Sequence, residues 1–425
     1  MVNEFSYRGG ELFAEGVAVR ELAERYGTPL YIYSRSHFAA QYRALAEAMA
    51  AVSPRIAYSV KANSNGAVIR SFAGQGACFD IVSGGELFRV RRAGVAADRI
   101  VYAGVGKTAA EIEYALREGI LFFTVESEPE AMQIGETARR LGVRGRVAFR
   151  VNPGVDPQTH TYISTGKKEN KFGLDLERVR RACEAAGRHP SLEVAGLHLH
   201  IGSQILSPAP FAEALETVSG LVRELKARHA GFRFLDIGGG IGIRYKPDQE
   251  PLAPAAYAQA VLPPLRALGL DVVLEPGRFL VGNGGLLVAR VQVVKESYFK
   301  TFVVVDAGMN DLIRPSLYQA HHEVTAVHET AERLFGDLVG PICESGDFLA
   351  ADRDLPAVRA GDLLAVQSAG AYGFSMASTY NSRPRAAEVM VEGARHALVR
   401  EREAWPDLVR GERFFDDEQG APQHV

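Results

Sequence analysis

Between about residue 30 and residue 280, short apolar runs alternate regularly with longer amphipathic stretches rich in Ala, Arg and Glu. Short runs with β-branched and aromatic residues predict strands, and apolar residues every three or four positions predict helices. The predicted strands are Arg55–Val60, Cys78–Val82, Arg99–Tyr102, Leu121–Val125, Arg146–Val151, Glu193–His200, Phe234–Ile237 and Val272–Leu274. The predicted helices between them include Glu111–Glu118, Pro129–Leu141, Leu176–Ala186 and Phe211–His229. Eight strands alternating with helices are typical of an α/β protein built on a (β/α)8, or TIM, barrel. A doubly wound open sheet gives a similar alternation and remains the alternative.

After about residue 280 the pattern changes, and strands follow one another with little helix between them. The predicted strands here are Val281, Leu286–Val294, Phe302–Asp306, Thr325–Val327, Leu363–Val366 and Ala387–Val391. This pattern predicts a separate β-rich domain, of the sandwich or barrel kind. Near the start, Glu11–Val17 is a possible strand before a predicted helix Ala18–Tyr26, and we expect this strand to join the C-terminal sheet. The expected domains are therefore a barrel of residues 30–280 and a β-rich domain of residues 1–29 and 281–425.

The composition narrows the classes of function. The chain has 425 residues, of which 47% are hydrophobic, and a formal net charge of −3 with acidic and basic residues interspersed. No basic face or polybasic arm points to nucleic acid or to a membrane surface. No apolar run is long enough to span a bilayer, and the first residues do not resemble a secretory signal. The three cysteines lack disulfide or zinc spacing, which predicts a cytoplasmic protein.

Lys61 lies at the polar end of the first predicted barrel strand, in the run Ile56-Ala57-Tyr58-Ser59-Val60-Lys61-Ala62-Asn63. A lysine at a strand end is usually a solvated surface charge. Here it precedes several later turns that carry groups of a different chemistry. An amine at the carboxyl end of a barrel strand can form a Schiff base with a carbonyl compound.

Two later turns offer a phosphate site and a partner for a ring nitrogen. Gly238-Gly239-Gly240 follows a predicted strand, and glycines let backbone N–H groups approach a phosphate closely. The alternative is a plain tight turn, and the run is not a dinucleotide-binding signature. Glu275 begins the Glu275-Pro276-Gly277-Arg278 turn after another strand. A carboxylate there can keep a pyridine nitrogen protonated, which makes the ring an electron sink; capping or ion pairing is the alternative.

His198 and His200 alternate at the end of the sixth predicted strand, so both are expected on one face of it. Either histidine could be an ordinary buried, hydrogen-bonded residue. His200, nearer the strand end, could stack on a cofactor ring, and Ser203 could reach a phosphate. A zinc site is not expected, because no Cys or acidic partner stands at ligand spacing.

Three more residues fit the same chemistry. Cys343 and Glu344 follow an apolar run in the β-rich part of the chain. A thiol can return a proton to a carbanion, and the glutamate could bind a cationic group of a substrate. Arg314 offers a two-pronged fork for a carboxylate. The alternatives are an inert cysteine and a surface arginine. Together with Lys61 and the two turns, these residues predict a pyridoxal-phosphate site.

The chain resembles the diaminopimelate decarboxylases from about residue 10 to residue 410. This family consists of fold-type III pyridoxal-phosphate enzymes related to ornithine and arginine decarboxylases and to alanine racemase. The motifs that carry the resemblance are Tyr58–Asn63, Phe79–Leu87, Arg150–Pro153, Lys168–Gly173, Gly196–Ile205, Asp236–Gly240, Glu275–Arg278, Asp306–Tyr318, Gly340–Asp347 and Ala369–Arg383. No position expected to be functional departs from the family's pattern.

The resemblance implies pyridoxal 5'-phosphate as the cofactor and no metal. Lys61 would form the Schiff base, Glu275 would bond the pyridine nitrogen, and His200 would stack on the ring. The implied cofactor contacts are Lys61, His200, Ser203, Gly239, Glu275, Pro276, Gly277, Arg278 and Tyr372. Within this set, Gly239 and the turn from Glu275 to Arg278 would hold the phosphate, with Ser203 assisting.

The resemblance also implies that the substrate is meso-2,6-diaminopimelate, which loses carbon dioxide to give L-lysine in the last step of lysine synthesis. The implied substrate contacts are Arg278, Arg314, Tyr318, Glu344 and Tyr372. Cys343 would donate the proton, and it and Glu344 would come from the second subunit of a homodimer. An ornithine or arginine decarboxylase needs no reader for a distal carboxylate, so Arg314 argues against that alternative. A racemase usually has two bases on opposite faces. A catalytically inactive regulatory homologue remains the alternative from a different class.

Overall fold

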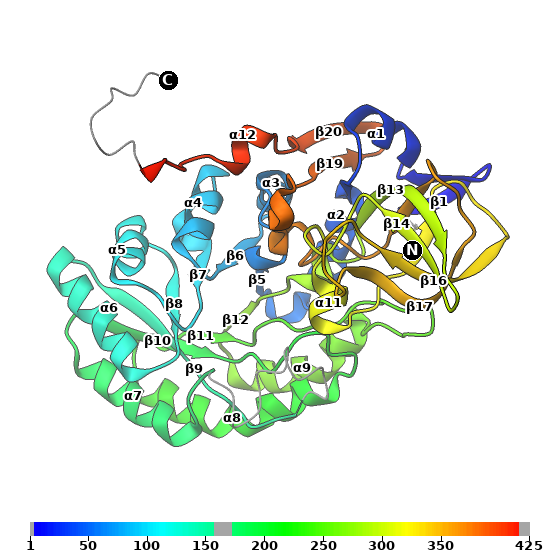
Figure 1. The fold of residues 1–425 in the computed structure, drawn as a ribbon. Coiled ribbons are helices and arrows are strands. Elements are labelled where there is room, and N and C mark those ends of the chain that lie inside the picture. Colours follow the sequence, from blue (N-terminus) through cyan, green and yellow to red (C-terminus); the bar gives the residue numbers. More distant parts are fainter. Residues whose placement is uncertain (1–3, 157–171, 416–425) are drawn as a thin grey trace.

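The structure, a computed structural model, describes residues 4–156 and 172–415. Eight parallel strands close into a barrel in chain order (Figure 1). The strands are β5 (Arg55–Ser59), β6 (Cys78–Ile81), β7 (Ile100–Tyr102), β8 (Phe122–Val125), β9 (Gly145–Arg150), β10 (Leu192–His198), β11 (Phe234–Asp236) and β12 (Asp271–Leu274). The predicted barrel is confirmed and the open sheet is not observed, because β12 pairs with β5 and closes the ring.

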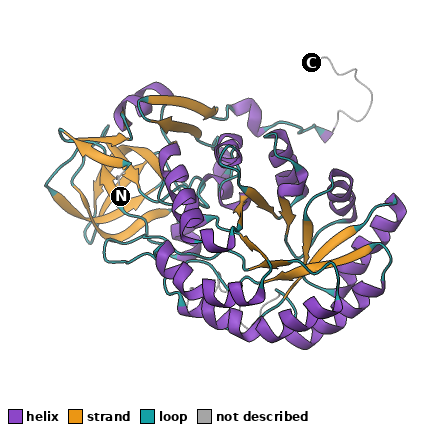
Figure 2. Ribbon diagram, turned by 180° about the vertical axis from the view of Figure 1, so that it is seen from behind, coloured by secondary structure: helices purple, strands orange, loops and turns teal. Residues whose placement is uncertain are grey.

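Helices surround the barrel and cover its strands (Figure 2). They are α2 (Arg35–Ala48), α3 (Gly66–Ala73), α4 (Gly84–Arg92), α5 (Ala109–Glu118), α6 (Glu128–Leu141), α7 (Leu176–Arg188), α8 (Ala209–Arg228) and α9 (Pro254–Leu268). Local sequence sets their ends. Thr108 and Glu111 form a capping box at the start of α5, and Gly119 ends that helix with φ of 73°. The helical stretches predicted within this ring are confirmed.

The inside of the barrel is filled by small and aromatic side chains. Ala57, Ala148 and Ala195 pack with Val101, Val273 and the Phe122 and Phe234 rings, whose centroids are 5.3 Å apart. Several buried polar residues, among them Ser59, Arg150, His198, Asp236 and Glu275, are found instead at or just beyond the carboxyl ends of the barrel strands. Since the loops after parallel barrel strands meet at that end, the fold places any site there.

The β-rich part is a nine-stranded sheet in which the long strand β13 (Gly285–Glu296) pairs with three others. The main path runs β17 (Phe348–Pro356), β16 (Arg333–Val339), β14 (Thr301–Val305), β13, β4 (Leu30–Ser34), β19 (Ala387–Glu392) and β20 (Arg395–Arg400), while β15 (Val324–Ala326) and β18 (Leu363–Val366) lie off it. The predicted strands from 286 to 391 are confirmed. The pattern missed β4, β16, β17 and β20. Two of these, β17 and β20, are charged edge strands, which lack a continuous apolar pattern.

The expectation for Glu11–Val17 was partly wrong: the segment bridges to the β-rich part through Glu11 and His328 but is not a strand of the large sheet. This segment is split into β2 (Glu11–Ala14) and β3 (Val17–Ala18), which form a separate small sheet with β1 (Phe5–Arg8). Glu15 has φ of 52°, and Gly16 packs against the backbone of Gly393, so the chain turns sharply between the two strands. The strand near the N-terminus that does join the large sheet is β4, between β13 and β19.

Val281 was predicted as a strand but is the last residue of the short helix α10 (Arg278–Val281). The Gly282 N–H donates to the Arg278 carbonyl, which makes this turn helical. The other short elements are α1 (Val19–Tyr26), α11 (Arg314–Tyr318) and α12 (Trp405–Leu408). The division of the chain at residues 30 and 280 stays a prediction. Residues 168–171 of the Lys168–Gly173 motif lie outside the described residues. In the part of the chain that the structure describes, no helix combines the length and the apolar character needed to cross a membrane.

Candidate active site

Lys61 lies in a short 3-10 turn directly after β5, at the carboxyl end of the barrel. Its Nζ donates a hydrogen bond of 2.7 Å to Oδ2 of Asp80, a fully buried residue of the neighbouring strand β6. Burial opposes the charged amine, but Asp80 and Glu275 outweigh it and raise the pKa of Lys61 above its ordinary value. The side chain keeps 36% of its surface exposed, so the amine is held in position and can still be reached from the pocket.

A buried cluster of ionisable groups lies beside Lys61. His198 ends β10, Asp236 ends β11 and Glu275 follows β12, and one polar atom of each lies within 4.8 Å of the others. His198 Nε2 is 3.1 Å from Glu275 Oε2, while Oε1 of Glu275 is buried without a partner among the described residues. Burial and the charge of Glu275 raise the pKa of Asp236 well above its usual range. Burial would raise the pKa of Glu275 too, but His198 outweighs it and lowers that pKa.

The barrel brings two carboxyl groups, those of Asp236 and Glu275, to His198 from strands that are distant in sequence. The expectation that His198 has no acidic partner suited to a zinc site was therefore wrong. That no metal binds remains a prediction. The buried Oε1 of Glu275 also suits a ring N–H, since a buried acceptor left without a donor is costly. Glu275 can therefore serve as the partner of a protonated pyridine nitrogen.

The glycine turn after β11 brings backbone unusually close to the neighbouring loops. A Cβ at Gly239 would lie 2.1 Å from the Glu275 carbonyl oxygen, and Gly238 and Gly240 have φ of 67° and 104°. Gly277 packs against Ser59 and Ala62, on either side of Lys61. Side chains are excluded at these positions, which leaves backbone free to line a phosphate site.

His200 and Ser203 lie in the loop after β10. His200 is past the strand end, so the expectation that both histidines belong to the strand was wrong for this one. The Gly239 N–H lies 3.3 Å from His200 Nδ1, and burial together with Arg150 lowers the pKa of His200, which is therefore neutral at pH 7. The Ser203 hydroxyl accepts a hydrogen bond of 3.0 Å from Arg278. His200 thus contacts the glycine turn and Ser203 contacts Arg278, while their predicted cofactor contacts stay predictions.

Arg278 and Arg314 are both about 5% exposed and approach each other across Tyr245. Arg278 donates to the Tyr245 hydroxyl at 2.5 Å, and the Arg314 guanidinium lies 4.7 Å from the centre of that ring. Among the described residues neither arginine forms an ion pair with a carboxylate, and the Nε of each is buried without a hydrogen-bond partner. Two buried cations with spare donors make a binding site for an anion.

Tyr318 and Tyr372 border the same space. Tyr318 ends α11 and lines a pocket of about 160 Å³ together with Tyr245, Arg278 and Arg314. Tyr372 has φ of 55°, its N–H bonds to the Ala62 carbonyl beside Lys61, and its ring lies 4.9 Å from the Arg278 guanidinium. Tyr372 therefore lies between the Lys61 turn and the arginine pair.

Cys343 and Glu344 are exposed and lie in a loop after β16. The Cys343 N–H donates to Asn381 Oδ1 at 2.9 Å, and the Tyr380 hydroxyl donates to Glu344 Oε2 at 2.8 Å. These contacts lie within the β-rich part of the chain. The structure thus gathers the predicted barrel residues with Arg314, Tyr318 and Tyr372, whereas the hydrogen bonds of Cys343 to Asn381 and of Glu344 to Tyr380 do not reach that group.

Sequence reasoning missed Asp80, Asp236, Tyr245 and His322. Asp80 and Asp236 carried a usable signal, because each is an acidic residue at the end of an apolar run that becomes a barrel strand. Tyr245 and His322 carried no such signal, because each contacts an arginine that only the fold brings close to it.

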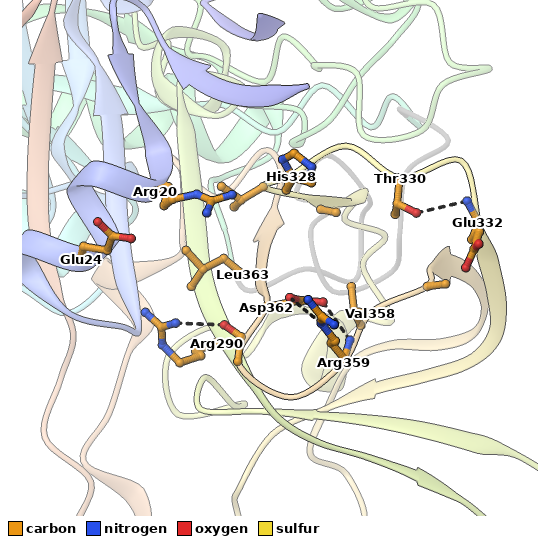
Figure 3. A pocket seen from close by; sticks show the side chains of 14 residues that line it. Arg20, Glu24, Arg290, His328, Thr330, Glu332, Val358, Arg359, Asp362 and Leu363 are labelled. Atoms are coloured by element: carbon orange, nitrogen blue, oxygen red, sulfur yellow. Dashed lines mark hydrogen bonds and ion pairs between the residues drawn. The ribbon is translucent and has the colours of Figure 1, made fainter. Parts of the chain in front are cut away.

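A second hollow, of about 470 Å³, lies between α1 and the strands of the β-rich domain (Figure 3). Arg290 donates to the Gly361 carbonyl at 2.9 Å, Arg359 turns toward Asp362, and Arg20 pairs with Glu11. Its three arginines thus each have a partner, and none of the predicted site residues lines it, so we do not assign a site to it.

The residues at the carboxyl end of the barrel fit pyridoxal 5'-phosphate. Lys61 offers an amine, Glu275 an unpartnered buried oxygen for a ring nitrogen, and the turn around Gly239 a backbone cradle closed to side chains. The pocket thus combines an amine, a carboxylate that can keep a pyridine nitrogen protonated, and a binding site for an anion. This combination suits reactions at the α-carbon of an amino acid.

Comparison with known proteins agrees with this geometry. Residues 35–282 match the family described as pyridoxal-dependent decarboxylase, pyridoxal binding domain. The diaminopimelate decarboxylase of Pseudomonas aeruginosa is 51% identical over 416 residues, which are 97% of this chain and 100% of that protein. That of Aquifex aeolicus is 48% identical over 409 residues, 95% of this chain and 96% of that protein. The crystal structure of diaminopimelate decarboxylase from Helicobacter pylori complexed with L-lysine is similar with a TM-score of 0.89 and 41% identity, covering 94% of this chain and 99% of that chain.

Proposed function

This chain belongs to the pyridoxal-dependent decarboxylases and, among them, to the diaminopimelate decarboxylase family, and we propose that it is a carboxy-lyase that converts meso-2,6-diaminopimelate to L-lysine and carbon dioxide. The observation that carries the choice of substrate is the pair of buried guanidiniums, Arg278 and Arg314, which lack an acidic partner among the described residues. Diaminopimelate keeps a second carboxylate at the end that does not react, and that anion would neutralise the pair. Ornithine and arginine have no such group.

Residues at the barrel end would hold the cofactor. Lys61 would form the Schiff base, Glu275 would face the pyridine nitrogen with its free Oε1, and His200 would stack on the ring. Gly239 and the turn from Glu275 to Arg278 would hold the phosphate, assisted by Ser203. When bound, pyridoxal phosphate supplies an electron sink that makes loss of carbon dioxide from the α-carbon accessible.

The remaining residues would orient the substrate and return the proton. Arg278, Arg314 and Tyr318 would bind substrate carboxylates, and Tyr372 would contact both cofactor and substrate. After carbon dioxide leaves, an acid must protonate the α-carbon on the face that the pocket presents. We assign that role to the Cys343 thiol and assign the distal ammonium to Glu344.

We infer that the active unit is a homodimer in which Cys343 and Glu344 of the partner subunit complete each pocket. Their exposure and their hydrogen bonds inside the β-rich part support this inference, because both side chains are open to a second chain and these hydrogen bonds do not connect them to Lys61 of their own chain. We also propose a cytoplasmic enzyme with a small-molecule substrate and no nucleic-acid partner, because acidic and basic residues are interspersed and the three cysteines are free.

The proposal is tested by incubating purified protein with pyridoxal phosphate and meso-2,6-diaminopimelate and measuring lysine by chromatography. We expect stoichiometric lysine and carbon dioxide, and protein that is yellow after dialysis. Colourless protein without lysine formation would instead support an inactive regulatory homologue.

Arg314→Ala should lower kcat/KM for diaminopimelate steeply. Loss of a charge-assisted contact to the distal carboxylate should cost about 2–4 kcal/mol in transition-state binding, or roughly 30- to 1,000-fold. Steady-state kinetics measure the change, and the visible spectrum checks that cofactor is still bound. Activity within a few fold of the wild type would show that Arg314 has no part in substrate binding.

Gly239→Ala should weaken cofactor binding. The new Cβ would lie 2.1 Å from the Glu275 carbonyl oxygen, so the turn that holds the ring and phosphate must shift. Such overpacking costs about 1–3 kcal/mol, and we expect roughly a 10-fold rise in the Kd for pyridoxal phosphate in a fluorescence titration. Gly220→Ala in α8 is the matched control, because a Cβ there meets nothing within 4 Å. Equal affinity of the two variants for pyridoxal phosphate would contradict the proposal that the turn around Gly239 holds the cofactor.

A further inference from the structure

Arg278 and Arg314 are held by two neutral side chains that the reaction itself does not use, Tyr245 and His322. Tyr245 is 8% exposed and lies between the two guanidiniums: its hydroxyl accepts from Arg278 at 2.5 Å, and its ring faces Arg314 at 4.7 Å. His322 is fully buried, and its Nε2 lies 2.8 Å from Nη1 of Arg314. The two neutral rings also touch edge to face, with centroids 5.4 Å apart.

The hydrogen bonds of His322 fix its tautomer. Nδ1 lies 2.8 Å from the Gln367 carbonyl oxygen, which can only accept, so the ring proton is on Nδ1. Nε2 then carries a lone pair and accepts from the guanidinium of Arg314. Burial and the charge of Arg314 lower the pKa of His322 well below its ordinary value, which agrees with this assignment. His322 is therefore a fixed acceptor and adds no further positive charge.

Tyr245 contacts both arginines. Burial opposes ionisation of the phenol, but Arg278 and Arg314 outweigh it and lower its pKa from the ordinary value of about 10. As a phenol, Tyr245 stabilises both cations through its hydroxyl and its electron-rich ring face without placing a carboxylate charge beside them. Carboxylates in these two positions would form ion pairs with the arginines and compete with any anionic ligand. Neutral acceptors position the arginines and leave their charge, and the unpartnered Nε of each, for the ligand.

We propose that Tyr245 and His322 are positioning residues that determine specificity. They hold Arg278 and Arg314, without ion pairs to acidic side chains, in the arrangement that binds the distal carboxylate of the substrate. This inference rests on the proposed function and goes one step beyond it. A ligand that carries the distal carboxylate is favoured, and an otherwise identical ligand that lacks it leaves the arginine pair, Arg314 above all, without that anion and binds more weakly.

L-lysine and cadaverine are the matched pair of ligands for the test, because they differ only in the carboxylate that the two arginines would read. Binding of each to the cofactor-loaded protein is measured by competitive inhibition and by calorimetry. The variants are Tyr245→Phe, which removes the hydroxyl and keeps the ring, and His322→Leu, which removes the acceptor. His322→Gln is the rescue variant, because its amide oxygen can accept from Arg314. Tyr42→Phe on α2, where the ring packs on Phe72, is the control outside the site.

We expect Tyr245→Phe and His322→Leu each to weaken L-lysine roughly 10-fold or more while cadaverine changes little, since each variant removes a hydrogen bond to a charged group. The same variants should raise KM for meso-2,6-diaminopimelate and leave kcat within a few fold. His322→Gln should regain most of the preference for L-lysine, and Tyr42→Phe should match the wild type.

If the binding of both ligands is weakened equally, the variants have a general structural defect. If the binding of L-lysine is not weakened, the arginines do not need these partners. Either result overturns the inference. Tyr245→Phe keeps the test decisive if His322→Leu does not fold. Failure of the proposed function gives a different result: the wild-type protein itself would neither form lysine from diaminopimelate nor prefer L-lysine to cadaverine.

Discussion

Lys61→Ala is expected to lower kcat/KM for meso-2,6-diaminopimelate by about four orders of magnitude or more, because it removes the only group proposed to link the cofactor covalently. The purified variant should lose the visible absorption of the Schiff base. In the wild type, borohydride reduction followed by peptide mass spectrometry should place the cofactor on the peptide that contains Lys61. These readouts report the linkage itself and do not depend on turnover.

Lys107 provides the control. It is also a buried lysine near the barrel end, but its Nζ donates to the carbonyls of Gly104 and Thr124 and to Glu130, all within 2.8 Å. An amine held by three acceptors is not available as a nucleophile. Lys107→Arg should therefore keep the label on Lys61. A label on Lys107, or Schiff-base absorption in Lys61→Ala, would contradict the assignment. Because Lys61→Ala leaves Asp80 without its ion pair, Lys61→Arg should be run beside it.

A mixture of Lys61→Ala and Cys343→Ala chains is expected to regain activity that neither variant has alone. If Cys343 of the partner subunit completes each pocket, a mixed dimer contains one site with both lesions and one site with neither. With random exchange about half of the dimers are mixed, so the mixture should recover roughly a quarter of wild-type activity. The measurement is lysine formation after subunit exchange, which native mass spectrometry can verify.

The control for this experiment is a mixture of Lys61→Ala with Glu275→Ala. Both residues lie in the same barrel, so every site of a mixed dimer carries one lesion and no activity should return. Recovery in this control would point to an artefact of mixing. No recovery with Cys343→Ala, despite proven exchange, would mean that each site is built from one chain.

The barrel could be predicted because its strands are buried on all sides and read as unbroken apolar runs, as in Phe122–Val125. The strand ends then placed Lys61, the glycine turn and Glu275 at one end of the molecule, since parallel barrel strands all end there. The strands that were missed had no such signature. β17 carries Asp352, Arg353 and Asp354 at a sheet edge, and β4 is a short run whose partners, β13 and β19, come some 250 residues or more later.

The residues of the site also differ in whether the sequence alone could reveal them. Residues that follow a predicted strand or lie in a motif of the family, such as Lys61 and Arg314, could be singled out from the sequence. Residues that act through a neighbour could not, because the partner is set by the fold. Asp80 holds Lys61 across two adjacent strands, and His322 is oriented by the Gln367 carbonyl, 45 positions away. The roles proposed for Cys343 and Glu344 depend further on the proposed second chain.

The most direct measurement of the central claim is the release of labelled carbon dioxide by the cofactor-loaded protein from meso-2,6-diaminopimelate, L-ornithine, L-arginine and D-lysine, each assayed alone under the same conditions. D-Lysine keeps the reacting centre of diaminopimelate but lacks the distal carboxylate. Because that carboxylate would neutralise Arg278 and Arg314, kcat/KM for diaminopimelate should exceed that for each of the others by about 100-fold or more. Comparable rates with D-lysine or L-ornithine would contradict the account.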